Sequence, residues 1–265
     1  MQDALRDATD NGADNGAEVS IQGYPETILN PAMQATWDLL EPLTLEVAAW
    51  VPIGMLHLGC DELPPDAGQS SPAAHRLMVG HGLQSRDDLQ GWMMAKLAAH
   101  LQAHGIRPAA WEEAAKGRNG GIGHNALLFS WTWQGAGMAA ARQGNDVVMC
   151  PAQHAYLDMA HTEGPEDWGA AWAAFTSLEE TIAWHPVPPG AKDTAPRVIG
   201  VEATHWGEFT TEDRQIKPML APHLLGIAHK GRDSTHTLTG PGLRRLAHPY
   251  GPLFQRIGWQ HHTGA

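Results

Sequence analysis

Strand-like and helix-like segments alternate along most of the chain, and this alternation limits the fold more than any other feature. Short apolar runs without turn residues are typical of buried strands, and stretches with apolar residues at helical spacing lie between them. We count five βα units, whose strands are predicted at residues 53–58, 107–113, 126–131, 146–150 and 197–203. Such an alternation favours a parallel sheet covered by helices, which places the chain in the α/β class.

Polar or aromatic residues cluster just after each predicted strand. They are Asp61 and Glu62, Trp111 and Glu112, Trp131, Tyr156 and Asp158, and Trp206 and Glu208. A (β/α)8 TIM barrel assembles its site from several strand ends on one face, so this clustering favours an incomplete barrel of about five βα units. A doubly wound sheet is the alternative, but it concentrates its site at one switch point and usually has a glycine-rich first turn.

The adjacent acids Asp61 and Glu62 follow the first strand within Met55-Leu-His-Leu-Gly-Cys-Asp-Glu-Leu63. Neighbouring strand residues point to opposite faces, so both acids serve one site only if the backbone turns there. Gly59 and the following Leu63-Pro64-Pro65 favour such a turn. Taken alone, an Asp-Glu pair is more often an exposed loop end.

Helices are predicted from capping residues and apolar periodicity. Asn30-Pro31 is expected to open a first helix. Its apolar stripe is formed by Leu39, Leu43 and Val47. Pro42 lies inside this helix and should kink or divide it. Ser85, with Asp88 three residues on, resembles a capping box for a helix that ends at Gly105. Further helices are expected near 136–142, 170–184, 213–229 and 243–257.

The amino-acid composition limits the size of the domain and the kinds of molecule that the chain can bind. The chain of 265 residues is 43% hydrophobic, enough for one large domain, which we expect at residues 29–265 after an acidic loop or terminus at 1–28. A net charge of −12 argues against nucleic acid as a partner. No stretch approaches the ~20 apolar residues of a membrane span, and the N-terminus has no apolar signal core, so localisation stays open. Eleven tryptophans provide flat faces that suit stacking on sugars.

Four segments carry a resemblance to a known family. They are His57-Leu-Gly-Cys-Asp-Glu62, Ala110-Trp-Glu-Glu113, Tyr156-Leu-Asp158 and Gly200-Val-Glu-Ala-Thr-His-Trp-Gly-Glu208. One such segment is a weak signal, but four in order and at matching spacing are specific. The chain resembles the family 20 glycoside hydrolases, the β-N-acetylhexosaminidases, from about residue 29 to residue 208.

The resemblance implies hydrolysis of a terminal non-reducing β-linked N-acetylhexosamine in an oligosaccharide, without a cofactor. The implied mechanism is retaining and substrate-assisted, so the acetamido oxygen of the sugar attacks the anomeric carbon. By matching position, Glu62 would be the general acid and base, and Asp61 would orient the acetamido group. Tyr156 would hydrogen-bond the acetamido oxygen.

The resemblance also implies a sugar-binding pocket. Asp158 and Glu208 would hold the outer hydroxyls, and Trp111, Trp131 and Trp206 would wall the pocket. These residue types suit the chemistry, because an apolar wall and a neighbouring carboxylate raise the pKa of a general acid towards neutral pH. A fixed carboxylate in a dry site favours an oxazolinium-like cation.

The chain also departs from the family pattern. It shows five strands where a barrel has eight, so the resemblance implies that the first three strands are missing. The sugar-binding arginine of an early strand end has no match, since Arg6 lies in no motif. Cys60 stands where glycine is commonest. Exposed sheet edges of a partial barrel favour self-association.

Structural roles compete with functional ones at several positions. Trp37, Trp50, Trp92, Trp172 and Trp184 are expected to pack in or beside helices. Trp133 either lines the pocket or caps a helix, and Glu112 and Glu113 are either solvated or supporting. His57 is expected to be a hydrogen-bonded core residue.

The sixteen histidines raise the question of a metal, but none is expected. His100 and His104 have metal-ligand spacing on one helix without an evident third ligand. His261-His262 lies at the end of the chain. Gly120-Gly-Ile-Gly123 lacks the lysine of a phosphate-binding loop and is expected to be a turn.

Three functions stay open on the sequence. The first is an active β-N-acetylhexosaminidase or its catalytic half. The second is an inactive remnant that binds N-acetylhexosamine. The third is a partial barrel that needs a partner chain to complete its sheet.

Overall fold

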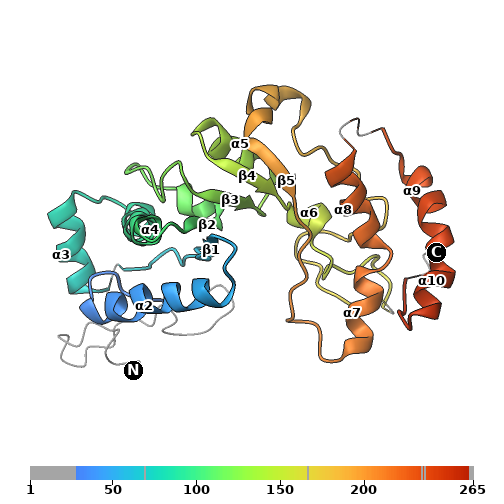
Figure 1. The fold of residues 1–265 in the computed structure, drawn as a ribbon, viewed down its shortest axis with the longest axis horizontal. Helices are drawn as coiled ribbons and strands as arrows, with labels where there is room; N and C mark the ends of the chain where they lie inside the picture. Colours follow the sequence, from blue (N-terminus) through green and yellow to red (C-terminus); the bar gives the residue numbers. More distant parts are fainter. Residues whose placement is uncertain (1–27, 69, 166, 234, 236, 263–265) are drawn as a thin grey trace. The chain divides into compact units, whose positions relative to one another are not determined.

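The computed structural model describes residues 28–68, 70–165, 167–233, 235 and 237–262. The acidic segment expected at 1–28, with Arg6, lies almost entirely outside these residues. The strands follow the order β1-β2-β3-β4-β5 in one sheet, so the α/β class is confirmed. The chain divides into two compact units, Met1–Leu128 and Phe129–Ala265, which we describe separately (Figure 1).

The strands of the first unit are parallel. β1 (Met55–His57) pairs with β2 (Arg107–Trp111), with Met55 opposite Arg107 and His57 opposite Ala109. β3 (Leu127–Ser130) begins in this unit and ends in the next. β1 is shorter than the predicted strand, because Ile53 at its expected start is 67% exposed.

Three helices and one 3-10 turn accompany these strands: α2 (Gln34–Trp50), α3 (Pro72–His81), α4 (Arg86–Ala103) and η1 (Glu112–Ala115). Trp92 of α4 joins them, since its ring lies edge-on to Trp37 of α2 and beside His81 of α3, at centroid distances of 5.7 and 5.1 Å. The packing roles predicted for Trp37 and Trp92 are therefore confirmed. The sequence did not predict α3.

The apolar stripe predicted for α2 is wrong. The residues that α2 buries are Thr36, Trp37 and Thr44, whereas Leu43 is 43% exposed. Tertiary contacts of Trp37 decide the orientation, because its indole N–H donates to the Pro31 carbonyl at 2.9 Å and the Lys96 ammonium lies 3.5 Å from its ring centroid. The helix begins at Gln34 rather than at Asn30-Pro31, and it continues through Pro42 instead of dividing there.

The capping predicted for α4 is confirmed. The Ser85 side chain accepts the N–H of Asp88 at 3.1 Å. The buried Asp88 carboxylate in turn accepts the N–H groups of Gln84 and Arg118 at 2.9 and 2.7 Å. These bonds lower the pKa of Asp88 and tie the start of α4 to the loop after η1. Gly105, with a φ of 73°, follows the helix as predicted.

The second unit continues the sheet with β4 (Asp146–Met149) and β5 (Val198–Val201), which are parallel. Between them lie α6 (Ala152–Ala155) and the 3-10 segment η2 (Pro189–Arg197), and α5 (Gln134–Arg142) precedes β4. Gly137 lets α5 approach the sheet closely, since a Cβ there would lie 2.6 Å from the Met149 sulfur.

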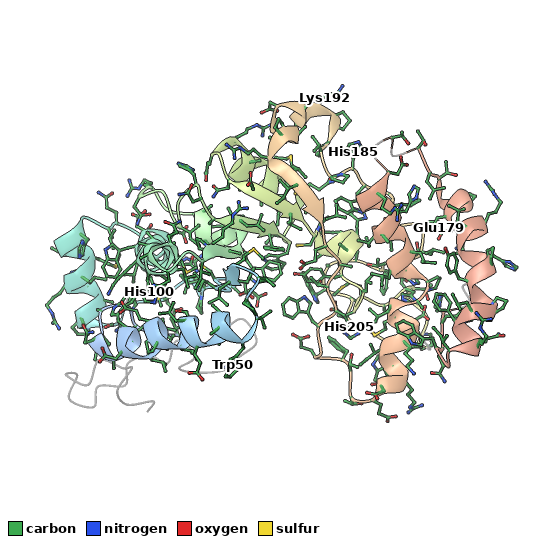
Figure 2. The ribbon with its side chains drawn as sticks, viewed as in Figure 1. Trp50, His100, Glu179, His185, Lys192 and His205 are labelled. Carbon is green, nitrogen blue, oxygen red and sulfur yellow. The ribbon has the colours of Figure 1, made fainter. Side chains whose placement is uncertain are left out.

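The C-terminal helices are α7 (Asp213–Leu220), α8 (His223–Arg232), α9 (Gly240–Ala247), η3 (His248–Tyr250) and α10 (Gly251–Arg256). The helix predicted at 213–229 is thus divided near Pro222, and the one at 243–257 is divided as well. One apolar cluster packs α9 against the segment before η2, and it contains Leu178, Ile182, Leu243 and Ala247. Glu179, labelled in Figure 2, forms an ion pair with Arg244 of α9 beside this cluster.

The helix predicted at 170–184 is wrong, because these residues form bends and turns instead. Backbone pairing with another segment replaces helical hydrogen bonding. The Ala170 N–H donates to Asp158 at 2.8 Å, and the Ala170 carbonyl accepts from Ala160 at 2.7 Å. Thr176 N–H also donates to Ala160, at 2.9 Å. Tertiary pairing here overrides local periodicity.

Over the described ranges, none of the helices combines the length and the hydropathy that a membrane span requires.

Candidate active site

The backbone turns sharply at the acid pair that follows β1. Gly59, Cys60 and Glu62 have φ angles of 73°, 84° and 53°, and two of these three residues are not glycine. Left-handed backbone at non-glycine residues costs about 1–2 kcal/mol each and is concentrated at functional sites. The turn expected from Gly59 is therefore present, and it leaves Asp61 exposed and Glu62 half-buried.

Hydrogen bonds from two neighbouring elements hold this turn. On the β2 side, the Gly59 carbonyl accepts the N–H of Trp111 at 3.0 Å. On the α4 side, Gln90 donates its amide to the Cys60 carbonyl at 3.0 Å and Arg86 donates to the Leu63 carbonyl at 2.6 Å. Sequence reasoning missed Arg86 and Gln90. Their spacing of i and i+4 on a predicted helix was the available signal.

His57 supports the same turn. Its Nδ1 accepts the N–H of Gly59 at 3.1 Å, and its ring lies edge-on to Trp111 at 5.0 Å. Burial lowers the pKa of His57, and the Asp61 carboxylate partly offsets this shift. A neutral, hydrogen-bonded imidazole agrees with the structural role expected for His57.

The acids after β2 are not solvated. Trp111, Glu112 and Glu113 are 8%, 4% and 7% exposed, so the solvated alternative for Glu112 and Glu113 is wrong. Burial raises the pKa of the Cys60 thiol, and the Glu113 and Asp61 carboxylates raise it further. Cys60 is therefore a protonated thiol and not a nucleophile at neutral pH.

The strain at Cys60 leads to a stability prediction. Cys60→Ala keeps a Cβ at a φ of 84°, whereas Cys60→Gly removes it. We expect the glycine variant to exceed the alanine variant by about 1 kcal/mol in free energy of unfolding, because glycine adopts this backbone without a steric penalty. Urea unfolding of the two variants measures the difference. Equal stabilities would mean that residue 60 carries no left-handed strain.

Aromatic rings gather around Tyr156 in the second unit. Its ring lies nearly parallel to Trp131, at a centroid distance of 6.3 Å and an interplanar angle of 20°. Trp172 stands edge-on to Tyr156 at 5.8 Å, and Trp206 is tilted against it at 6.2 Å. We call Trp131, Tyr156, Trp172 and Trp206 the aromatic cluster. Tyr156 is buried, while Trp172 and Trp206 are 58% and 38% exposed.

Sequence reasoning missed Trp172, for which it expected a packing role. The predicted helix at 170–184 was the cause, because it removed Trp172 from the strand ends. Trp133 is 62% exposed and occupies the N-cap position of α5 without a side-chain capping bond. The helix-capping alternative is therefore met in position only, and the pocket alternative stays a prediction.

Backbone pairing places the carboxylate of Asp158 near the segment that carries Trp206 and Glu208. The segment around Tyr156 pairs with Thr204 as a parallel bridge, and Leu157 N–H donates to the Thr204 carbonyl at 2.8 Å. This pairing brings Asp158 near the segment that carries Trp206 and Glu208. His205, labelled in Figure 2, lies on the same segment.

Asp158 is the most perturbed acid of this group. It is 3% exposed, and its Oδ1 accepts no hydrogen bond from any residue that the structure describes. Burial raises the pKa of Asp158, the Trp206 N–H lowers it, and the Glu208 carboxylate raises it. A buried carboxylate oxygen without a donor can accept a hydroxyl group of a ligand.

The predicted site residues therefore fall into two groups. Asp61, Glu62 and Trp111 belong to the first unit, whereas Trp131, Tyr156, Asp158, Trp206 and Glu208 belong to the second. Each group combines carboxylates with indole rings at strand ends. A parallel sheet that carries such groups is typical of α/β glycoside hydrolases.

Residues 2–231 match the model of the glycosyl hydrolase family 20 catalytic domain. The chain belongs to this family. It is 32% identical over 217 residues to the β-hexosaminidase of Vibrio furnissii, covering 81% of this chain and 35% of that protein. It is 24% identical over 266 residues to the β-N-acetylhexosaminidase of Cellulomonas fimi, covering 98% and 48%.

A solved structure of the same family resembles this chain in fold. The exo-β-N-acetylglucosaminidase of Vibrio harveyi, solved in complex with N-acetylglucosamine, is 30% identical with a TM-score of 0.83. The match covers 92% of this chain and 38% of that one. The chain spans less than half the length of each of these relatives.

Proposed function

We propose that this chain carries a β-N-acetylhexosaminidase site, which hydrolyses a terminal non-reducing β-linked N-acetylhexosamine. The observation that carries the proposal is the left-handed turn at Cys60 and Glu62, which presents two adjacent acids at a strand end. Natural sequences tolerate such strain mainly where function needs it. Family membership supplies the reaction class.

The proposed reaction is substrate-assisted and retaining. Glu62 donates its proton to the glycosidic oxygen while the acetamido oxygen of the substrate attacks the anomeric carbon. The bond to the leaving group breaks, and an oxazolinium forms. The Glu62 carboxylate then takes a proton from the water that opens this intermediate. Asp61 accepts the acetamido N–H and stabilises the positive charge.

The second group binds the sugar in this proposal. The Tyr156 hydroxyl donates to the acetamido oxygen, and the buried Asp158 accepts an outer hydroxyl together with Glu208. Indole faces of Trp131 and Trp206 stack on the C–H side of the pyranose, and Trp111 walls the acid pair. We add Trp172 to this set, because its ring contacts both Trp131 and Tyr156.

The proposal extends to the architecture. We infer that residues 29–265 form a partial (β/α)8 barrel domain, in which the five strands are consecutive barrel strands. The parallel order of the sheet and the likeness to the Vibrio harveyi enzyme support this inference. Unpaired edges of such a sheet favour self-association of the chain.

A substrate comparison tests the mechanism. We expect release of nitrophenol from a nitrophenyl β-N-acetylglucosaminide and no detectable release from the matching β-glucoside, because a hydroxyl group cannot replace the acetamido oxygen as nucleophile. Equal cleavage of both substrates would contradict substrate assistance. Binding of N-acetylglucosamine without turnover would instead identify an inactive remnant, and turnover restored by a second chain would identify a partial barrel.

A further inference from the structure

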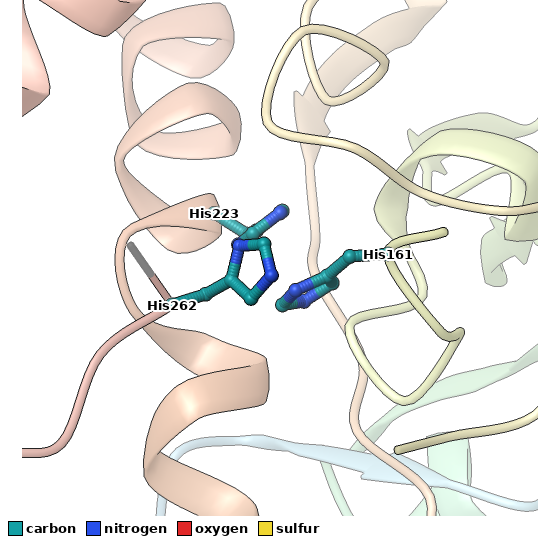
Figure 3. Close-up of side chains that lie close together, drawn as sticks. All are labelled: His161, His223 and His262. Atoms are coloured by element: carbon teal, nitrogen blue, oxygen red, sulfur yellow. The ribbon is translucent and has the colours of Figure 1, made fainter. Parts of the chain in front are cut away.

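Three histidines of the second unit, none of them among the site residues described above, lie together. They come from distant parts of the chain: His161 follows α6, His223 is the first residue of α8, and His262 follows α10 (Figure 3). Each offers one ring nitrogen, and these nitrogens lie within 4.8 Å of one another. We call these residues the histidine trio.

Two members of the trio, His161 and His223, are buried, and His262 is half-buried. His223 is 1% exposed, and within the described part of the chain neither of its ring nitrogens has a hydrogen-bond partner. His161 is 7% exposed, and its Nε2 also has no hydrogen-bond partner among the described residues. Buried polar atoms without partners cost about 1–3 kcal/mol each, so these nitrogens point to a partner other than the residues that the structure describes.

The imidazoles are in the form that binds a metal. Burial, together with a smaller effect of the neighbouring imidazoles, lowers the pKa of His223 to about 2 and that of His161 to about 4. Both rings are therefore neutral at physiological pH, with a lone pair available. Metal binding requires this neutral form.

We propose that His161, His223 and His262 bind one divalent transition-metal ion, with Zn²⁺ as the best fit. Three imidazole ligands and one open position are a recurrent zinc arrangement. Tetrahedral zinc with bonds of about 2.0–2.1 Å places its ligand nitrogens roughly 3.4 Å apart. Any two nitrogens of the trio that lie farther apart than this, within their 4.8 Å limit, therefore move closer together when the ion binds.

The ring arrangement shows what this contraction involves. His161 and His223 are stacked, with centroids 3.7 Å apart and an interplanar angle of 17°, while His262 stands edge-on to His161 at 4.3 Å. Stacked rings hold their lone pairs side by side. One ring therefore rotates about its side-chain bonds when the ion binds, a movement of side chains and not of helices.

A carboxylate supports the third ligand. The His262 Nε2 lies 3.4 Å from Oδ1 of Asp167. Burial raises the pKa of this carboxylate, but the Thr162 hydroxyl and His262 lower it by more. Histidine ligands commonly give their second nitrogen to a carboxylate, which orients the ring and leaves the first nitrogen for the metal. His262 is also positioned by its backbone N–H, which donates to the Ala221 carbonyl at 2.9 Å.

The ion would join the chain's final described segment to the start of α8 and to the loop after α6. Because the unfolded chain does not hold these ligands together, binding stabilises the folded second unit. The pair His100 and His104 on α4 is a poorer candidate. His100 Nε2 and His104 Nδ1 already contact backbone carbonyls of Glu41 and His100, both at 2.9 Å.

Metal titration of the full chain tests the proposal. After treatment with a chelator and its removal, we expect equilibrium dialysis to give one Zn²⁺ per chain, and Co²⁺ to give the visible absorption of a four-coordinate site. Saturating Zn²⁺ should raise Tm by about 5 °C or more. A folded wild-type chain that binds no Zn²⁺ would overturn the proposal.

Variants locate the site. We expect His262→Ala to weaken Zn²⁺ binding at least 100-fold, and His161→Gln to do the same as a second variant with a smaller change in volume. His261→Ala, at the adjacent residue, and His100→Ala, on α4, serve as controls that retain binding. Folding of every variant is checked by circular dichroism. Unchanged Zn²⁺ affinity in a folded His262→Ala or His161→Gln chain would overturn the assignment.

Discussion

Glu62→Gln is expected to lower kcat by at least about 10²–10⁴-fold, the contribution typical of a positioned general acid. Glutamine keeps the size of the side chain and its hydrogen-bonding oxygen, but it has no acidic proton for the leaving oxygen. The loss should be larger for a chitobiose-like disaccharide than for a nitrophenyl glycoside, because a sugar leaving group needs the proton more than nitrophenolate does. Steady-state assays with both substrates measure this difference.

The control is Asp66→Asn, which likewise replaces a carboxylate by its amide, at an exposed acid four residues further along. This variant should keep wild-type kcat. An equal loss for both substrates in Glu62→Gln would contradict a general-acid role. Wild-type kcat in a folded Glu62→Gln chain would remove Glu62 from the mechanism.

Asp158→Asn is expected to lower kcat/KM by about 100-fold, because a hydrogen bond between a sugar hydroxyl and an ionised carboxylate contributes roughly 1.5–3 kcal/mol. The effect should appear mainly in KM, since Asp158 is proposed to hold an outer hydroxyl and not the reacting atoms. Assays over a range of substrate concentrations separate the two constants. Unchanged KM would mean that Asp158 does not contact the substrate.

The same substitution should stabilise the folded protein at neutral pH. Burial raises the folded-state pKa of Asp158 above its ordinary value of 3.8. Between 3.8 and the raised pKa the folded state binds more protons than the unfolded state, so the free energy of unfolding falls as pH rises through this window. Above the window the ionised buried carboxylate opposes folding, and asparagine removes this cost.

Urea unfolding at several pH values checks the expectation. Asp158→Asn should exceed wild type in stability at pH 7, and the difference should shrink as the pH falls towards 3.8. Asp213→Asn, at an exposed acid of α7, should match wild type throughout. A variant with higher stability and lower activity would fit a site that is strained for function.

Local signals predicted several elements correctly. The Ser85 cap, the apolar spacing of α4 and Gly105 act within a few residues of one another, so their outcome does not depend on distant parts of the chain. The parallel pairing of β1 with β2 and of β4 with β5 follows from the strand–helix alternation. The acid pair after β1 was likewise found from the sequence, and so was the turn that carries it.

Long-range contacts decided the features that the sequence did not show. α2 buries Trp37 instead of its apolar stripe because the indole finds a carbonyl acceptor and a lysine partner. Residues 170–184 avoid the predicted helix because Ala170 pairs with Asp158 and Ala160. The spacing of Arg86 and Gln90 was visible in the sequence, but their acceptors are backbone carbonyls of a distant loop, which the sequence does not identify.

The sequence by itself determined the α/β class, the family, and the residue types at the strand ends, since periodicity and motif spacing are properties of adjacent residues. Only the tertiary structure decided which face of α2 is buried, that Trp172 joins the aromatic cluster, and that three distant histidines meet. Contacts of this kind depend on how separate segments pack, and the free energy of that packing is not encoded in the spacing of any one segment.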